Sequence, residues 1–277
     1  MKADLHMHSV WSDGQYMPAE LAVLCRQSGV ELASLTDHDN FAGDGEKRAA
    51  FAAAGVGYLT GVEISAYEGK TKVHVTGYGY DAASPLCAAL QRERARLADE
   101  RLDDVLERLK KYKDIRLSRE DVLAERKADV PVHTLHIASA LVKKGFYPNL
   151  KGAFLDCFQP DSPTYSYVGR PTPVEAIEML HSLGGVACLA HPGRIWLPFE
   201  ERAALIRQLK DRGLDGIECT YPTHTAEETA YYLSLCEELG LFRTGGSDFH
   251  RDGGGRTLGV PFFEPDEAFL RAVHFCV

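Results

Sequence analysis

The sequence has no apolar run of the roughly 18 residues that a membrane-spanning helix needs. Its first residues, MKADLHMHS, include no apolar segment of the kind that marks a secretory signal peptide. We therefore expect a soluble cytoplasmic protein without a membrane partner. The seven cysteines are odd in number and form no C-x-x-C motif, which disfavours a disulfide framework and a structural zinc knuckle. We expect reduced cysteines in the core.

Two catalytic signatures and a basic surface are also missing. The sequence contains neither a G-x-x-x-x-G-K phosphate loop nor a G-x-S-x-G nucleophile elbow, so P-loop chemistry and a covalent serine mechanism are disfavoured. The net charge of −9 does not suit a general nucleic-acid binder, which needs a basic face. Residues 84–165 alone carry slightly more Lys and Arg than Asp and Glu. That excess is too small to predict long nucleic acid as a partner.

Strand-like and helix-like segments alternate along most of the chain. Strand-like runs occupy 2–8, 31–39, 56–65, 72–80, 185–192, 214–222 and 241–250, and helix-like runs occupy 18–29, 45–55, 172–185, 199–213, 225–240 and 265–275. This alternation predicts a parallel β/α architecture. Polar residues at the C-terminal end of nearly every strand-like run favour a closed or nearly closed barrel over an open sheet.

One long segment, residues 84–165, breaks the alternation. It begins with a charged helix at roughly 84–112, whose apolar stripe includes Leu86, Leu102, Val105 and Leu109, and shorter helix-like pieces follow around 118–126, 134–144 and 149–158. We interpret it as a helical insertion between two barrel strands, either a cap over the site or a decoration far from it. The predicted domains are the first part of the barrel (1–83), the helical insertion or cap (84–165) and the second part of the barrel (166–277).

Histidines and carboxylates gather at the ends of the strand-like runs. His6 and His8 end the first run as H-x-H, and Asp248 and His250 end the last as D-x-H. On a strand, residues i and i+2 point the same way, so each pair can reach one ion. Barrel closure would bring the first and last strands side by side, and the two pairs would then meet.

Further residues of the same types follow this pattern. His38, Glu63 and His191 end the second, third and fifth runs, and His74 lies within the fourth. Imidazole and carboxylate without thiolate suit Mn, Fe or Zn. So many ligands exceed the needs of one ion, which predicts two or three divalent ions sharing bridging carboxylates. Such clusters activate water and bind phosphoryl oxygens.

The motifs MKADLHMHSVWSDG, SLTDHDN, GVEIS, HVTGYGY, LAHPGR and GSDFH, in this order, resemble the polymerase-and-histidinol-phosphatase (PHP) family. Within it, the chain is most similar to stand-alone bacterial phosphoesterases that act on nucleotides. The resemblance implies a distorted (β/α)7 barrel with a helical insertion domain and a three-metal site. It implies one ion at His6, His8, Glu63 and Asp248, a second at Glu63, His74 and His191, and a third at Asp13, His38 and His250. We call these residues the ligand set; Asp13 enters it through the resemblance alone.

Contacts to the substrate are predicted from fewer signals. Arg194, three residues after His191, is either a bidentate phosphate clamp or a surface arginine. His136 is a candidate donor to the substrate, although Thr134 stands where the resemblance leads us to expect an arginine. Ser247 is a further candidate, and Arg256 a weaker one.

The function predicted is hydrolysis of a phosphomonoester by metal-activated water, with the ligand set catalytic through that water. The substrate expected is a small phosphorylated molecule, such as a 3′,5′-nucleoside bisphosphate or a nucleoside monophosphate. The alternatives are a 5′-3′ exonuclease on short oligonucleotides, a histidinol-phosphate phosphatase and a non-catalytic metal-binding module. The oligomeric state is not indicated by the sequence.

Overall fold

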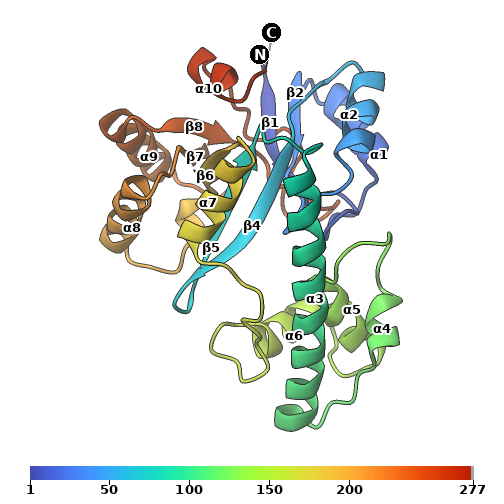
Figure 1. The fold of residues 1–277 in the computed structure, drawn as a ribbon. Helices are drawn as coiled ribbons and strands as arrows, with labels where there is room; N and C mark the ends of the chain where they lie inside the picture. The colour runs from blue at the N-terminus through green and yellow to red at the C-terminus, as the bar shows by residue number, and fades with distance from the viewer. Residues whose placement is uncertain (276–277) are drawn as a thin grey trace. The chain divides into compact units, whose positions relative to one another are not determined.

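The computed structural model describes residues 1–275, and the chain divides into two compact units (Figure 1). Met1–Ala88 and the chain from Pro171 onwards form the first unit, and Ala89–Arg170 forms the second. These limits lie near the domain boundaries predicted from the sequence. The assignment of the second unit as an inserted cap stays a prediction.

The strands of the first unit form two sheets, one with the order β1-β2-β3 and one with the order β4-β5-β6-β7-β8. Within them, β1, β2 and β3 are parallel, as are β6, β7 and β8, whereas β5 is antiparallel to both of its neighbours. The strands are Ala3–Met7 (β1), Leu32–Leu35 (β2), Gly57–Tyr58 (β3), Gly61–Glu68 (β4), Thr71–Tyr78 (β5), Val186–Leu189 (β6), Gly216–Thr220 (β7) and Phe242–Gly245 (β8).

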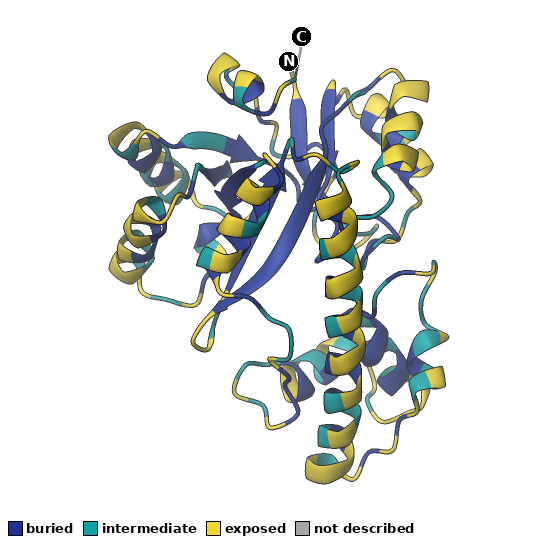
Figure 2. Cartoon of the chain, viewed as in Figure 1, coloured by how far each residue is buried: buried dark blue, intermediate teal, exposed yellow. Residues whose placement is uncertain are grey.

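Helices alternate with these strands and pack around them, as predicted. Side-chain caps explain two of the starts, since the hydroxyls of Thr172 and Thr225 accept hydrogen bonds from the first turns of α7 and α9. Figure 2 shows buried strands and helices whose outer faces are exposed. The helices of this unit are Pro18–Gln27 (α1), Asp44–Ala53 (α2), Pro173–Ser182 (α7), Pro192–Arg194 (η1, a 3-10 turn), Phe199–Asp211 (α8), Ala226–Leu239 (α9) and Glu267–Ala272 (α10).

The prediction that all strands are parallel is wrong for β5. Strand β4 ends at Glu68 and β5 begins at Thr71, and so short a link allows only a hairpin, because a parallel crossover needs a dozen or more residues. The run expected as one strand at 56–65 is also split into β3 and β4. The chain passes from one sheet to the other at Gly61, where a Cβ atom would lie 2.0 Å from the hydroxyl of Ser34.

Isolated bridges connect the two sheets. His38 pairs with Glu63, and Met7 pairs with Phe249, both in the parallel sense. The C-terminal ends of β1 and β2, the first residues of β4 and the segment after β8 therefore lie together. Among residues 1–275 the strand ladder remains two separate sheets, so the structure shows a mixed α/β fold with parallel strands, and closure into a (β/α)7 barrel stays a prediction.

The second unit is helical, as predicted, and has its own core. Leu102, Val105 and Leu109 of α3 pack with Ile137 of α5, whereas Leu86, expected in the same stripe, is exposed. No helix in the described part of the chain is both long enough and apolar enough to cross a bilayer. The helices are Pro85–Lys113 (α3, which starts in the first unit), Arg119–Leu123 (α4), Thr134–Lys143 (α5) and Leu150–Cys157 (α6).

The cysteines behave as the sequence suggests. Six of them are buried free thiols: Cys25, Cys87, Cys157, Cys188, Cys219 and Cys236. Cys276 lies outside the described residues.

A buried ion pair fixes the loop that follows β1. The Nζ atom of Lys47 lies 2.7 Å from Oδ2 of Asp37, and both side chains are buried. Asp37 also accepts hydrogen bonds from the backbone N–H of Ser9 at 2.8 Å and from the hydroxyl of Ser12 at 2.8 Å. Burial acts to raise the pKa of Asp37, but the ammonium of Lys47, together with His8 and the hydrogen bond from Ser9, outweighs it, and the pKa falls below its usual value. The pair thus ties α2 to the loop that carries Asp13.

Replacing Lys47 by methionine should lower the free energy of unfolding by about 3–5 kcal/mol, because it leaves the carboxylate of Asp37 buried without its partner. Denaturant titration measures this loss. In the wild type, the stabilisation is complete above the pKa of an unfolded aspartate, about 3.9, and is lost as the pH falls towards the lower folded value.

Arg48→Met is the matched control, because Arg48 is the next residue of α2 and its side chain is exposed. It should change the stability by less than about 1 kcal/mol. A Lys47→Met protein as stable as Arg48→Met would contradict the role given to the pair.

Candidate metal centre

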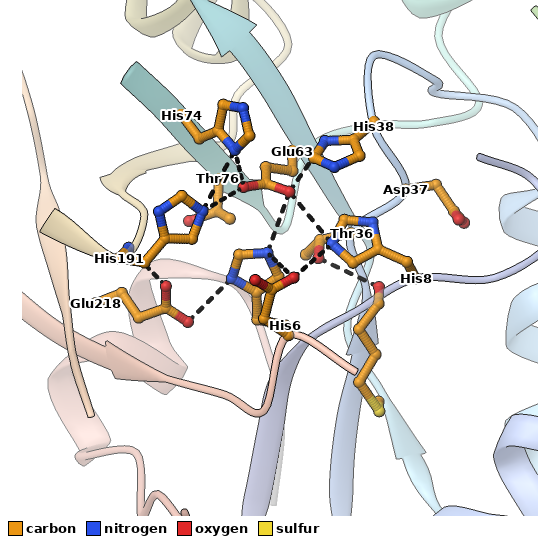
Figure 3. A network of polar contacts seen from close by, with 12 residues as sticks. His6, His8, Thr36, Asp37, His38, Glu63, His74, Thr76, His191 and Glu218 are labelled. Atoms are coloured by element: carbon orange, nitrogen blue, oxygen red, sulfur yellow. Dashed lines mark hydrogen bonds and ion pairs between the residues drawn. The ribbon is translucent and has the colours of Figure 1, made fainter. Parts of the chain in front are cut away.

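The two oxygens of Glu63 face different imidazoles (Figure 3). Its Oε2 atom lies 3.2 Å from the Nε2 atoms of both His6 and His8. Its Oε1 atom lies 2.6 Å from Nδ1 of His74 and 2.9 Å from Nε2 of His191. One carboxylate with an oxygen turned towards each pair has the arrangement of a bridging ligand between two ions.

Asp248 joins His6, His8 and Glu63 in the most buried group. Its Oδ1 atom lies 3.1 Å from Nε2 of His8 and 3.6 Å from Nε2 of His6. One ligand atom from each of the four residues lies within 4.8 Å of the others. Bonds of about 2.0–2.2 Å to a metal place neighbouring ligand atoms roughly 3 Å apart. The four atoms are thus spaced nearly as a single ion requires.

A second group gathers around Asp13. Its Oδ1 atom lies 3.4 Å from Nε2 of His250, and its Oδ2 atom lies 3.9 Å from Nε2 of His38. The Nδ1 atom of His8 lies 3.8 Å from Oδ1 of Asp13. Except for His8, these side chains are partly exposed, so the second group lies nearer to solvent than the first.

The structure brings the whole ligand set together, in groups close to those that the resemblance implies. Two residues take a wider part than expected: His8 also lies with the Asp13 group, and His38 also lies with Glu63 and His74. Coordination of ions by these residues stays a proposal.

Several ligand atoms are buried without a hydrogen bond of good geometry. They include Nε2 of His6, Nε2 of His8 and Oε2 of Glu63. A buried polar atom without a partner costs about 1–3 kcal/mol, and a cation among these atoms would satisfy all of them. Burial acts to raise the pKa of Glu63, but the surrounding imidazoles, His74 first among them, hold it well below its usual value. The carboxylate is therefore ionised, and the residues fit divalent ions with nitrogen and oxygen ligands.

Glu218 on β7 was not predicted as part of the site. Its Oε1 atom lies 3.0 Å from Nδ1 of His6, and its Oε2 atom accepts a hydrogen bond of 2.7 Å from the backbone N–H of His191. His191 itself has a left-handed backbone with φ of 30°, which is uncommon outside glycine. Glu218 thus orients one ligand and holds the strained backbone of another. The available signal was a carboxylate inside the apolar run GIECTY, since a buried carboxylate needs a partner.

Ser247 holds β1 in place. Its hydroxyl donates to Oδ2 of Asp4 at 2.6 Å, its backbone N–H donates to Oδ1 at 2.9 Å, and the residue is fully buried. A Cβ atom on the neighbouring Gly246 would lie 2.5 Å from the backbone N of His6. The glycine therefore allows this segment to approach β1 closely. Ser247 does not line the pocket described next.

A pocket of about 290 Å³ opens onto the ligand set. It is lined by His38, Glu63, His74, His191, Asp248 and His250 from that set, and by Lys72, Arg194, Arg251, Gly254 and Arg256. Lys72 and Arg251 were not predicted. The pocket thus combines carboxylates and imidazoles with four cationic side chains, which is the charge pattern that a phosphate group needs.

Three donors hold the second oxygen of Asp248. The hydroxyl of Tyr221 donates to Oδ2 at 2.7 Å, and the guanidinium groups of Arg256 and Arg194 lie 3.0 Å and 3.5 Å from it. Asp248 therefore presents only Oδ1 to the imidazoles. Arg194 is half-exposed and lines the pocket, which favours the phosphate clamp over the surface arginine.

His136 and Thr134 lie on α5, in the helical unit. Nδ1 of His136 accepts a hydrogen bond of 3.0 Å from the backbone N–H of His133, which caps the start of the helix. The structure thus gives His136 a local role, and its contact with substrate stays a prediction.

Comparison with known proteins decides the family. Residues 4–153 match the PHP domain. The chain belongs to the PHP domain family. This PHP protein is 31% identical to the 3′,5′-nucleoside bisphosphate phosphatase of Chromobacterium violaceum, over 92% of this chain and 90% of the relative. It is 32% identical to a 5′-3′ exoribonuclease of Haemophilus influenzae, over 93% of both chains.

A solved structure agrees with the family. A Bifidobacterium adolescentis protein, provisionally assigned as a metal-dependent phosphoesterase, superposes with a TM-score of 0.82 at 30% identity, over 98% of this chain and 94% of that one. The family resemblance stated from the motifs is confirmed, as is the prediction of a metal-dependent hydrolase of phosphoric esters.

Glu218→Gln should weaken metal binding or activity about 10- to 100-fold, because the neutral amide no longer stabilises the orientation of His6 and the backbone of His191. Bound metal after gel filtration and the Mn²⁺ dependence of hydrolysis measure the effect. Glu237→Gln, at an exposed position of α9, is the control and should match the wild type. Unchanged metal affinity and activity in Glu218→Gln would refute the orienting role.

Proposed function

We propose that this PHP protein hydrolyses a phosphomonoester of a small nucleotide, such as a 3′,5′-nucleoside bisphosphate or a nucleoside monophosphate. The observation that carries this proposal is the pocket of about 290 Å³, in which four cationic side chains lie beside the ligand set. The similarity to a nucleoside bisphosphate phosphatase supports the nucleotide as substrate.

The ligand set is proposed to hold two or three divalent ions, Mn, Fe or Zn, which would supply Lewis acidity and an activated water for the displacement. Glu63 would bridge two of the positions, because its oxygens face separate pairs of imidazoles. Glu218 would keep His6 in one tautomer by contacting its Nδ1 atom at 3.0 Å. The nitrogen turned towards Glu63 is then left for coordination.

The cationic side chains are proposed to bind and orient the phosphate. Arg194 has a planar fork of donors that matches two phosphoryl oxygens, and its Nη1 atom is positioned by the hydroxyl of Tyr221 at 3.0 Å. Lys72 and Arg251 line the same pocket and add positive charge where charge on the phosphoryl group develops.

The size of the pocket favours a small substrate. Its volume of about 290 Å³ lies just below the roughly 300–1,000 Å³ usual for small-molecule sites. The net charge of −9 opposes binding of long nucleic acid. The second candidate function is 5′-3′ exonuclease activity on short oligonucleotides, which the similarity to the Haemophilus influenzae exoribonuclease supports.

Hydrolysis should require the ligand set and its ions. Phosphate release from a panel of nucleoside mono- and bisphosphates should stop with a chelator and return with Mn²⁺. His8→Ala and Asp248→Asn should each lose at least about 100-fold in kcat/KM, because each removes a proposed ligand. His181→Ala changes a histidine that contacts Asp215 rather than the ligand set and should keep full activity. Activity that survives in His8→Ala or Asp248→Asn would overturn the assigned site.

Labelled oligonucleotides of graded length separate the two candidate functions. A phosphatase with a small pocket should lose kcat/KM steeply beyond one or two nucleotides, because the net charge of −9 opposes binding of the additional phosphates. Release of mononucleotides from short RNA as fast as phosphate from a bisphosphate would favour the exonuclease.

A further inference from the structure

Trp196 is almost fully exposed. Its exposed fraction is 94%, and among residues 1–275 the next most exposed large apolar side chain is Leu155 at 60%. Tryptophan is highly buried on average, and a flat aromatic surface left in water is costly unless a partner covers it for part of the time. The residue therefore suggests a binding role.

The segment that carries Trp196 is fixed at the edge of the phosphate pocket. The backbone N–H of Arg194 donates to the carbonyl of His191 at 2.9 Å, and that of Ile195 donates to Pro192 at 3.1 Å. The side chain of Ile195 is buried. The indole is thus attached to a well-ordered turn that begins at a residue of the ligand set.

Trp196 follows the proposed phosphate clamp by two residues. Ile195, between them, has an extended backbone with φ of −72° and ψ of 124°. A span of two residues is at most about 7 Å, so the Cα atoms of Arg194 and Trp196 lie close together. Arg194 lines the phosphate pocket and Trp196 lines the hollow described next, and both side chains are exposed.

A shallow hollow of about 390 Å³ lies beside the indole. It is lined by Gly193, Ile195, Trp196, Leu197, Pro198 and Arg202. The guanidinium of Arg202 is held by Glu228 at 3.1 Å, so the wall of the hollow is ordered. The lining combines four apolar side chains with the guanidinium of Arg202, which suits a heteroaromatic ring.

We propose that Trp196 is the platform on which the nucleobase of the substrate stacks while Arg194 holds its phosphate. This inference rests on the proposed function, since it specifies how a nucleotide is distinguished from other phosphate esters. A base stacked on an aromatic side chain contributes roughly 5- to 150-fold in affinity, and it does so for every base. Trp196 would therefore select for nucleotides without choosing among bases.

A second hollow is an alternative binding site for the base. It has a volume of about 670 Å³, is lined in part by Tyr221, His224, Ala230 and Leu233, and shares Arg256 with the phosphate pocket. Tyr221 is only 3% exposed, and its hydroxyl is engaged by Asp248. The ring of Tyr221 therefore offers no open face for stacking, whereas the indole of Trp196 does. Trp196 is the better platform.

Kinetics with paired substrates test the proposal in the Mn²⁺-loaded enzyme. Adenosine 5′-monophosphate and ribose 5-phosphate carry the same phosphate ester, with and without a base. Trp196→Ala should raise KM for adenosine 5′-monophosphate by roughly tenfold with kcat unchanged, and should leave KM for ribose 5-phosphate unaltered. Trp196→Phe should recover most of the lost affinity.

The kinetic test has two control variants, and two outcomes would contradict the proposal. Leu155→Ala, another exposed apolar residue, and Ala230→Phe, which fills the second hollow, should both match the wild type. Equal KM for adenosine 5′-monophosphate in Trp196→Ala and the wild type would overturn the proposal. A loss in Ala230→Phe as large as the one expected for Trp196→Ala would also overturn it, because it would place the base in the second hollow.

Fluorescence tests stacking independently of turnover. The chain has two tryptophans, so in the Trp11→Phe holoenzyme the emission reports Trp196 alone. Adenosine 5′-monophosphate should quench it within the first turnover in stopped flow, and ribose 5-phosphate should not. Quenching without phosphate release from any nucleoside mono- or bisphosphate of the panel would support the platform and refute the phosphatase. Phosphate release without base-dependent quenching would refute the platform and leave the phosphatase standing.

Discussion

The site depends on a buried carboxylate, Glu63, surrounded by imidazoles. Segments from both sheets meet at it, since His6 lies on β1 and His74 on β5. A buried charge is stable only with partners, and the imidazoles supply them only in part, because Oε2 lacks a well-aligned hydrogen bond. Binding of cations at Glu63 would therefore stabilise the junction of the two sheets as well as form the reactive centre, so that folding and metal binding are linked.

Other buried carboxylates hold the segments that carry the ligands. Glu218 accepts the backbone N–H of His191, Asp4 that of Ser247, and Asp37 that of Ser9. Each therefore fixes a loop at the end of a strand, where the ladder no longer satisfies the backbone. Part of the acidity of this chain, with its net charge of −9, is thus internal and structural rather than a property of its surface.

The spacing of residues along the chain predicted which side chains form the centre of the site. The residues at the edge of the site depend on how distant strands pair. The H-x-H at His6 and His8 places both Nε2 atoms 3.2 Å from Glu63, as a two-residue period on an extended chain requires. Lys72 precedes His74 by two residues and lines the same pocket, so the same period contained that signal too. The two-residue period gave no signal for Glu218, because the order of the strands in the sheet decides which face of β7 meets His6. The short link before β5 contained the signal for its antiparallel direction, which the predicted parallel architecture missed, but it contained no signal for its register.

Asp248 connects the two halves of the pocket. Its Oδ1 atom faces the imidazole of His8 at 3.1 Å, whereas its Oδ2 atom faces the guanidinium groups of Arg256 and Arg194 at 3.0 Å and 3.5 Å. The two guanidinium groups would repel each other without a counter-ion, and this carboxylate supplies one. A cation at Oδ1 draws the negative charge of Asp248 towards itself and weakens its attraction for the arginines. Occupation of the ligand set would then leave the guanidinium of Arg194 better able to bind a phosphate.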